Sequence, residues 1–510
     1  MKQAKLTLSR SFVKSKTDDR IFGSFVEHMG STVYNGIYEP DHPLADEQGF
    51  RKDVIDLVKE LNLSVIRYPG GNFTSGYNWE DTVGPVAERP QRLELAWQAI
   101  EPNTFGLNEF MNWSAKVGTE TMMTVNLGTR GADEARNIVE YCNFDQGAYW
   151  CDLRRKHGIE KPYGIKYWCL GNELDGNWQI ATRKAEEYGH IANEAAKVMK
   201  WVDPSIECVA VGSSACWLDS FPTWDKVVLD ETYDNVEYLA MHTYLHPVKG
   251  VPTGNGEKVR LDLSSYLAKG LEMEKQIKDV IAACDYVQAV KRSKKKMMLS
   301  LDEWNVIGDH TEKEHEPWKI GSPIDWTLYS MRNVLVCTSM LMNILKYSDR
   351  IKMACQSLLV NTGPLIVTDK GGDAWKNAIY YPMDQVSRYG RGEVLYDVFD
   401  CPTYDSVEFD EVNAIDTVSV YNEEKKELTV FAMNRTDEDI SLSADIRDFG
   451  AKGVKHHLVM ENEDMFNLRN TCDNKLALSP KETDRTTLDG GYADIQVKKY
   501  SWNVVVFDLA

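Results

Sequence analysis

The sequence predicts an α/β fold, a (β/α)8 TIM barrel with a C-terminal β-sandwich. Short runs of β-branched and aromatic residues alternate with longer amphipathic segments between about residues 20 and 360. After Tyr389 the pattern changes to short alternating runs separated by Asn, Asp and Gly. A chain of 510 residues also exceeds what one hydrophobic core usually supports. We therefore expect the barrel over 18–385 and the sandwich over 1–17 plus 386–510.

Eight runs rich in β-branched and aromatic residues are the predicted barrel strands. They cover residues 21–26, 64–68, 122–126, 165–170, 206–211, 236–241, 297–301 and 351–355. Between them lie amphipathic stretches long enough for crossover helices, such as 50–61, 183–202 and 261–289. An open doubly wound sheet is the rival fold, but no G-x-G-x-x-G follows an early strand. The repeated strand-then-helix units therefore favour a barrel.

Five further runs are predicted to be antiparallel strands of the sandwich. They cover residues 417–421, 428–433, 440–446, 454–460 and 502–509. Residues 422–425 are typical of a hairpin loop, and we expect the alternating residues 4–8 to complete the sandwich. The most apolar stretch, residues 333–345, is too short for a membrane span of about 20 residues. We expect it to be a buried helix.

Composition and charge exclude several classes of partner. Hydrophobic residues make up 43% and charged residues 27%, the balance of a soluble globular protein. The formal net charge of -20 argues against nucleic acid, because binding to phosphates depends on clustered Lys and Arg. The N-terminus lacks the apolar core of a secretory signal, and the ten cysteines form no C-x-x-C pair. We expect buried free thiols, a cytoplasmic location and no membrane partner.

Polar residues at the C-terminal ends of the predicted strands are the positions to inspect, because TIM barrels carry their active sites there. They are Glu27, His28, Arg67, Asn72, Asn126, Asn172, Glu173, His242, Tyr244, Asp302, Glu303 and Asn305. Asn126 is about as readily a turn residue that closes its strand, so we leave it out of the site. Glu173 and Glu303 follow non-adjacent strands, four and seven, so they can face each other across the barrel mouth. Paired carboxyls about 5–5.5 Å apart are the catalytic geometry of retaining glycosidases. Such crowding also separates the two pKa values, so that one carboxyl stays protonated.

Each candidate also has a structural interpretation. Either glutamate alone could be one of the many solvated carboxylates among 78 acidic residues, but the matching positions of Glu173 and Glu303 favour catalysis. His242 could be a histidine satisfied by the backbone, and Tyr244 could be a core aromatic. Tyr244 is the better candidate, because a phenol can orient a nucleophilic carboxylate by hydrogen bonding.

Aromatic residues and histidines near these positions complete the candidates. Trp97 and Trp178 adjoin the site and could stack on a sugar, although a place in the core is an alternative. The histidines that invite a metal interpretation are His310, His315, His456 and His457. No H-E-x-x-H or Cys/His ligand spacing supports them, so we expect no metal and no cofactor.

Several segments are specific enough to indicate a family. They are residues 25–30 (FVEHMG), 67–73 (RYPGGNF), 75–81 (SGYNWED), 125–131 (VNLGTRG), 170–176 (LGNELDG) and 302–306 (DEWNV). With these segments in this order, the chain resembles glycoside hydrolase family 51, the α-L-arabinofuranosidases, over nearly its full length. The resemblance implies a (β/α)8 barrel with a jelly-roll sandwich, a retaining double displacement, no metal cofactor and often a hexameric assembly.

The resemblance also implies roles for the residues at the barrel mouth. Our hypothesis is that Glu303 is the nucleophile and Glu173 the acid/base. The expected substrate-binding residues are Glu27, Asn72, Asn172, Tyr244, Trp97, Trp178 and Gln356, with Arg67 and His242 in supporting positions. Two segments depart from the family pattern. Leu358 stands where the family usually carries a glutamine, and Gln356 is the candidate substitute for it. Residues 243–247 (TYLHP) replace the more usual paired tyrosines.

The sequence thus predicts hydrolysis of terminal non-reducing α-L-arabinofuranosyl residues from arabino-oligosaccharides, arabinan or arabinoxylan fragments. We expect the enzyme to act in arabinan degradation and L-arabinose metabolism. We also expect it to assemble as a homo-oligomer, with a hexamer as the state that the resemblance implies. The nearest rival is the same machinery acting on a β-xyloside, a β-glucan or a galactofuranoside, because a fold does not fix the pocket walls. A non-catalytic carbohydrate-binding protein is disfavoured, since both glutamates are present.

Overall fold

Eight parallel strands close into a barrel in the computed structural model, which describes residues 2–248, 260–308, 315–324 and 328–510. The barrel strands are β2 (Gly23–Phe25), β3 (Val65–Tyr68), β6 (Glu120–Thr124), β7 (Tyr167–Cys169), β8 (Glu207–Ala210), β9 (Tyr238–Leu245), β10 (Met298–Val306) and β11 (Ile351–Gln356). Each overlaps one predicted run, and they pair in chain order, with β11 closing onto β2. The predicted TIM barrel is confirmed.

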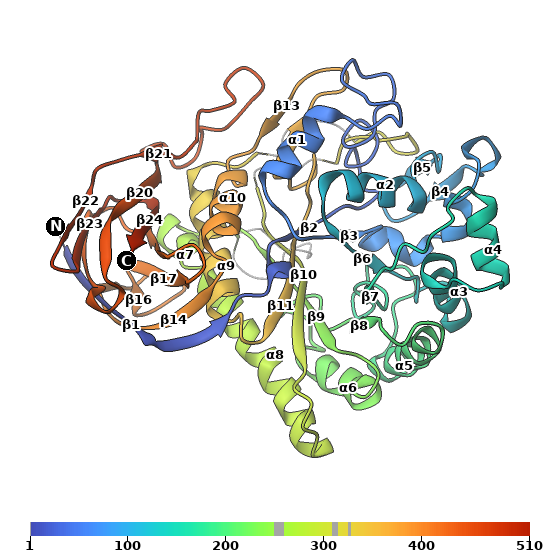
Figure 1. Cartoon of the computed structure of the whole chain (residues 1–510), viewed down its shortest axis with the longest axis horizontal. Helices are drawn as coiled ribbons and strands as arrows, with labels where there is room; N and C mark the ends of the chain where they lie inside the picture. Colours follow the sequence, from blue (N-terminus) through green and yellow to red (C-terminus); the bar gives the residue numbers. More distant parts are fainter. Residues whose placement is uncertain (1, 249–259, 309–314, 325–327) are drawn as a thin grey trace.

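Helices surround the barrel, as the amphipathic segments predict (Figure 1). They are α1 (Lys52–Glu60), α2 (Leu107–Val117), α3 (Ala132–Asn143), α4 (Tyr149–Lys156), α5 (Ala185–Val202), α6 (Thr223–Thr232), α7 (Leu263–Leu267), α8 (Gly270–Lys291), α9 (Met331–Lys346) and α10 (Tyr380–Tyr389). The single helix predicted over 261–289 is two helices, because α7 ends before Ala268 and α8 starts at Gly270. The predicted buried helix is confirmed as α9, in which residues 331–345 are all buried.

The two ends of the chain build one ten-stranded sheet, which we call the terminal sheet. Its strands, in spatial order, are β21 (Lys481–Glu482), β20 (Ala451–Glu461), β24 (Ser501–Leu509), β18 (Glu427–Asn434), β17 (Ile415–Asn422), β14 (Glu393–Asp400), β1 (Lys2–Lys16), β19 (Ile440–Asp445), β23 (Tyr492–Val497) and β22 (Thr486–Asp489). The sheet is mixed and not wholly antiparallel as predicted, because β1 runs parallel to β19 and antiparallel to β14. The sheet curls around its own core, so the expected sandwich is one continuous curled sheet.

Short elements occupy the connections. Three small hairpins are β4 (Arg92–Glu94) with β5 (Ala99–Glu101), β12 (Ile366–Thr368) with β13 (Ala374–Lys376), and β15 (Thr403–Tyr404) with β16 (Val412–Asn413). Single 3-10 turns are η1 (Asp19–Ile21), η2 (Asn72–Gly76), η3 (Trp79–Thr82), η4 (Val86–Glu88) and η5 (Arg447–Phe449). The connections η2 and β4–β5 matter for function, because both bring side chains to the mouth of the barrel.

Strand β24 shows how the terminal sheet and the barrel share one interface. Val505 and Phe507 belong to the core inside the curled sheet, whereas Trp502, Val504 and Val506 belong to the barrel core. Alternate residues of a strand point to opposite faces, so both faces of β24 are buried. Helices α9 and α10 lie between the two bodies (Figure 1), and α9 packs on β17, β18 and β24. The terminal sheet therefore closes the outer side of α9.

The state of the cysteines and the apolar character of the helices bear on two further expectations, buried free thiols and the lack of a membrane-spanning helix. All ten cysteines are free, and Cys169, Cys208 and Cys355 are fully buried in barrel strands, as predicted. In the described part of the chain, no helix combines the length and the apolar character needed to cross a membrane.

Replacing Trp502 with alanine should lower the free energy of unfolding by about 3–5 kcal/mol, the usual cost of deleting a large buried side chain. Trp502 is fully buried, stacks on Phe431, and donates a 2.7 Å hydrogen bond from Nε1 to Oε1 of Gln385 on α10. The measurement is denaturant or thermal unfolding. Trp201→Ala on α5, where 74% of the side chain is exposed, is the control and should change stability by less than about 0.5 kcal/mol.

Candidate active site

A cavity of about 800 Å³ opens at the C-terminal ends of the barrel strands. Its walls include most of the predicted site residues, namely Glu27, Asn72, Trp97, Glu173, Trp178, His242, Tyr244 and Glu303. They come from the ends of β2, β7, β9 and β10 and from the connections that follow the strands. The volume is in the range of cavities that bind small ligands. Strands β9 and β10 and the connections after β2, β3 and β7 therefore converge on one pocket, which is the candidate active site.

Glu303 lies within β10 and is held by donors from two other strands. Its Oε1 accepts a 2.6 Å hydrogen bond from Nη1 of Arg67, and its Oε2 accepts a 2.8 Å bond from the hydroxyl of Tyr244. Tyr244 is oriented in turn by Ser357, whose hydroxyl is 2.8 Å away. Burial raises the pKa of Glu303, while the positive charges of His242 and Arg67 oppose this effect. Both oxygens face donors, which is the environment of a carboxylate that must stay ionised.

Glu173 lies just beyond β7, on a backbone that turns sharply. Its φ of 46° is in the left-handed region, which is uncommon for a residue other than glycine and is often found at functional sites. One carboxyl oxygen accepts a 2.6 Å hydrogen bond from Nε1 of Trp178, and the other lies 2.9 Å from Nδ1 of His242. An oxygen of Glu173 lies within 4.8 Å of an oxygen of Glu303. The turn therefore brings this carboxyl over the nucleophile candidate.

His242 stands between the two carboxyls. Its Nδ1 is 2.9 Å from Oε1 of Glu173 and 3.5 Å from Oε2 of Glu303, and its Nε2 is 3.0 Å from Oδ1 of Asp302. Burial alone would lower the pKa of His242, but the charges of Glu303 and Asp302 raise it well above its ordinary value. His242 is therefore a buried cation, which the sequence could suggest only as a supporting residue.

Glu27 forms the opposite wall of the cavity, together with Trp97. Its Oε1 accepts hydrogen bonds from the Phe73 amide at 2.9 Å and from Nε1 of Trp97 at 3.0 Å. Burial and the charge of Glu303 raise the pKa of Glu27 to about 8, so it is protonated at neutral pH. Glycine at position 71 leaves space for this carboxyl, because a Cβ there would lie 2.1 Å from Oε2 of Glu27.

Comparison with known proteins agrees with this geometry. The model of the α-L-arabinofuranosidase 1 domain matches residues 57–252, and that of the α-L-arabinofuranosidase C-terminal domain matches residues 302–501. The chain is 48% identical to the intracellular exo-α-(1→5)-L-arabinofuranosidase 1 of Bacillus subtilis, covering 99% of both chains. It is 40% identical to an exo-α-(1→6)-L-arabinofuranosidase of Bifidobacterium longum, covering 99% of this chain and 97% of the other.

Among solved structures, a family 51 α-L-arabinofuranosidase from Bifidobacterium longum superposes with a TM-score of 0.93 at 35% identity, covering 99% of this chain and 100% of the other. The chain belongs to glycoside hydrolase family 51. It is an exo-acting α-L-arabinofuranosidase of this retaining family, as the sequence predicted.

Two of the predicted sugar-binding residues of this family 51 enzyme do not line the cavity. Asn172 is buried, accepts from Nη2 of Arg67 at 2.8 Å and donates to Oδ1 of Asn72 at 3.2 Å. Its amide is thus occupied in holding Asn72, which does face the cavity. Gln356 is fully buried and donates to the Gly363 carbonyl at 3.0 Å. A substrate-binding role for Gln356 stays a prediction, and in this structure its amide is bonded away from the cavity.

Three further residues lie in or behind the walls of the cavity and had no substrate-binding role predicted from the sequence. Leu358 lines the cavity at the position of the family glutamine, so the wall there is apolar. Trp217 packs near Trp178, with ring centroids 5.8 Å apart, and both line the cavity. Asp302 contacts His242 from behind the cavity and had no predicted role. Trp217 lies in a loop without a strand pattern, so only its aromatic side chain could have indicated it.

The carboxyls and His242 also have a spacing that a metal could use. One atom each of Glu173, His242 and Glu303 lie within 4.8 Å of one another, the one such group in the described part of the chain. Hydrogen bonds among these residues account for the close spacing, and the absence of a metal stays a prediction. Of the histidines considered from sequence, His310 lies outside the described residues. His457 is bonded to Asn503 and Thr486 within the terminal sheet.

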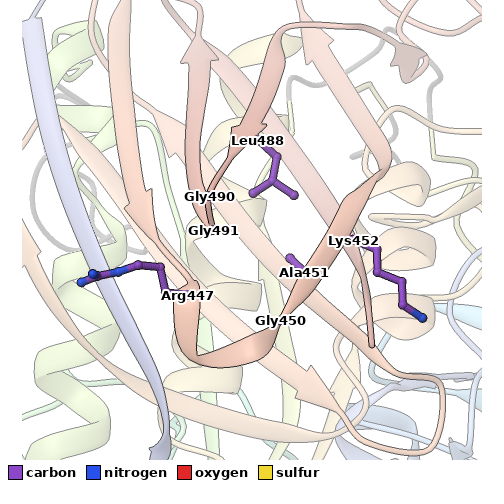
Figure 2. Close-up of a pocket in the computed structure, with 7 residues that line it drawn as sticks. All are labelled: Arg447, Gly450, Ala451, Lys452, Leu488, Gly490 and Gly491. Atoms are coloured by element: carbon purple, nitrogen blue, oxygen red, sulfur yellow. The ribbon is translucent and has the colours of Figure 1, made fainter.

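A second, smaller hollow of about 370 Å³ lies on the terminal sheet, beside the turn from η5 into β20 (Figure 2). It is lined by Arg447, Gly450, Ala451, Lys452, Leu488, Gly490 and Gly491. No carboxyl faces it, and Figure 2 shows the side chains of Arg447 and Lys452 pointing away from each other. The paired carboxyls needed for glycoside hydrolysis are thus found in the barrel cavity, not here.

Proposed function

We propose that this enzyme removes terminal α-L-arabinofuranosyl residues from arabino-oligosaccharides and from arabinan or arabinoxylan fragments, with Glu303 as nucleophile and Glu173 as acid/base. The observation that carries these roles is the spacing of the two carboxyls, whose oxygens lie within 4.8 Å. Inverting enzymes keep their carboxyls about 6.5–9.5 Å apart to admit a water molecule. The shorter separation here suits direct attack by one carboxylate.

The buried charges around the nucleophile support the assignment of the two roles. Arg67 and His242 are cations, while Asp302, Glu303 and Glu173 are carboxyls, and all five are buried. Burying unpaired charge is costly, so charge balance favours a state in which one of the three carboxyls is protonated. Asp302 faces both cations, and Glu303 accepts from two donors. Glu173 is the remaining carboxyl of the three, which supports its assignment as the acid/base.

The reaction follows in two displacements. In the first, an oxygen of Glu303 forms a bond to the anomeric carbon, the bond from that carbon to the leaving oxygen breaks, and Glu173 gives its proton to that oxygen. In the second, Glu173 takes a proton from water, the water oxygen bonds to the anomeric carbon, and the ester to Glu303 breaks. Arabinose is released with its configuration retained, and both glutamates return to their first state.

Linkage and location belong to the same proposal. The two similar relatives are named for (1→5) and (1→6) linkages, and the higher identity is to the (1→5) enzyme. We infer a preference for short α-(1→5)-linked arabino-oligosaccharides. Because that relative is named intracellular, we also infer that this enzyme works inside the cell on imported oligosaccharides, within L-arabinose metabolism. The aromatic pair Trp178 and Trp217 offers a stacking surface for the sugar on the leaving-group side.

Replacing each catalytic glutamate with alanine should give different kinetic defects on 4-nitrophenyl α-L-arabinofuranoside. Glu303→Ala should lower turnover at least about 10³-fold, because no other group here is placed to attack. Glu173→Ala should keep the first step, since nitrophenolate needs little protonation, and should show a burst followed by slow turnover. Stopped-flow release of nitrophenolate separates the two.

The same assay tests the sugar when the β-D-xylopyranoside and β-D-galactofuranoside of 4-nitrophenol are run alongside. Turnover of the arabinofuranoside alone supports the proposed sugar. Equal loss in both alanine variants, without a burst, would contradict the role assignment.

The activity should fall as the pH rises through about 8, because Glu27 ionises there. A protonated Glu27 can donate to a sugar hydroxyl, and its ionisation adds a negative charge beside Glu303. Glu27→Gln stays neutral and keeps a donor, so in this variant the decline in kcat/KM should begin at a higher pH than in the wild type. Glu134→Gln is the matched control, because burial also raises the pKa of Glu134 to about 8, but that residue lies on α3 outside the cavity. An unchanged decline in Glu27→Gln would refute the assignment.

We also propose that the enzyme assembles as a homo-oligomer, with the hexamer implied by the family resemblance as the expected state. Light scattering coupled to size-exclusion chromatography should then give six times the chain mass of 58.1 kDa. A single species at the chain mass, independent of concentration, would exclude assembly.

A further inference from the structure

Asp302 faces the opposite edge of the His242 ring from the two catalytic carboxyls. Its Oδ1 lies 3.0 Å from Nε2 of His242, whereas Nδ1 of the same ring faces Glu173 at 2.9 Å and Glu303 at 3.5 Å. Asp302 is 2% exposed and does not line the cavity. The imidazole is therefore held between a carboxylate behind the site and the carboxyls within it.

A bulge in β10 explains why neighbouring residues both reach this ring. Ser300 pairs with Ala240 of β9, yet Glu303 pairs with His242, so β10 has one more residue than β9 over this interval. The same extra residue occurs against β11. Successive residues of a regular strand point to opposite faces, and a bulge breaks that alternation. Asp302 and Glu303 can therefore both point into the barrel.

The positions of the carboxylates indicate which nitrogens of the His242 ring carry a proton. Each nitrogen of His242 faces a carboxyl oxygen, and a ring nitrogen without a proton would place its lone pair against that oxygen. Both contacts are favourable when both nitrogens carry protons, as an ion pair to Asp302 and a hydrogen bond to Glu173. The charged groups around the ring are Asp302 and Glu303 from β10, Glu173 and Asp175 from the loop after β7, and Arg67 from β3. Negative groups outnumber the single other cation.

We propose that Asp302 is a positioning residue that acts through His242, holding the ring doubly protonated and aimed at Glu173 and Glu303 throughout the reaction. The proposal rests on the function proposed above and adds a group that never touches the sugar. When Glu173 has given up its proton, Glu303 is esterified to the sugar, and the positive charge of the ring stabilises the new carboxylate of Glu173. Asp302 keeps that charge in place by supplying the partner for Nε2.

The alternative is that Asp302 only balances Arg67. The carboxylate lies 3.6 Å from Nε of Arg67, longer than its 3.0 Å approach to His242. Arg67 already contacts Glu303 at 2.6 Å and Asn172 at 2.8 Å. Nε of Arg67 has no hydrogen-bond partner of its own, so Asp302 also faces an unpaired nitrogen there. The shorter distance favours His242 as the group that Asp302 serves.

The test is the pH dependence of kcat/KM on 4-nitrophenyl α-L-arabinofuranoside. Asp302→Asn is made in the Glu27→Gln enzyme, which serves as the wild type for residue 302, so that the ionisation of Glu27 does not set the alkaline limb. Without the negative charge, His242 should lose a proton at lower pH, so the alkaline limb should move down by about one pH unit or more. At the pH optimum, kcat/KM should fall about tenfold or more. An alkaline limb that stays at the wild-type position in a folded variant would overturn the proposal.

A double-mutant cycle with His242→Gln tests whether Asp302 acts through that ring. In the His242→Gln background, Asp302→Asn should change kcat/KM by less than about twofold and should leave the pH profile unmoved. Additive losses would mean that Asp302 acts by another route. Running both variants with Glu27→Gln removes the ionisation of Glu27 from the same pH range.

Asp302→Glu covers the case in which the asparagine variant does not fold. It keeps the charge, so its alkaline limb should stay within about half a pH unit of wild type even when turnover falls. If the alkaline limb of Asp302→Glu moves down by about one pH unit, as expected for Asp302→Asn, the result counts against the proposal. If Glu303→Ala and Glu173→Ala lose activity while the pH profile of Asp302→Asn does not move, only the positioning role is refuted. Retained activity in those alanine variants would refute the proposed function itself.

Discussion

Charge compensation inside the barrel mouth is the constraint on which the rest of the site depends. Arg67 and His242 are nearly inaccessible to solvent, as are the carboxyls of Asp302, Glu303 and Glu173. Single charges in such a place would be costly, whereas paired and hydrogen-bonded charges can be held. Each cation therefore has more than one carboxyl partner, and the arrangement fixes the position of both catalytic glutamates before any sugar arrives.

Barrel closure supplies these partners from two directions. Strands β9 and β10 are neighbours, and their register places His242 opposite Glu303 and Tyr244 opposite Asn305. Arg67 comes from β3, which is not adjacent to β10, so its long side chain must reach through the barrel interior to Glu303. An arginine suits that position, because its planar group can contact Glu303 and Asn172 with different nitrogens. A shift of either strand would separate partners that no local rearrangement could rejoin.

The sequence predicted all eight barrel strands and the two paired glutamates, because buried parallel strands are continuous apolar runs and catalytic groups follow their ends. It missed four strands of the terminal sheet, namely β14, β21, β22 and β23, which are short or have less regular apolar patterns. It gave Asp302 no role, since regular alternation would turn this residue away from its neighbour Glu303. The β10 bulge that overrides alternation depends on pairing with β9 and β11, which the sequence of one strand does not encode. The placement of Gln356 outside the cavity walls could not be predicted for the same reason, because its bond to Gly363 is a tertiary contact.

The two glutamates differ in how firmly the fold holds them, and the difference matches what each must do. Glu303 lies within a strand and accepts from Arg67 and Tyr244, which suits a group that attacks from one position and always needs to be ionised. Glu173 lies past the strand end, with a left-handed backbone, and its partners are Trp178 and His242. An indole N–H and a protonated imidazole donate to either form of a carboxyl. Glu173 can therefore exchange its proton with the leaving oxygen and with water while its contacts stay in place.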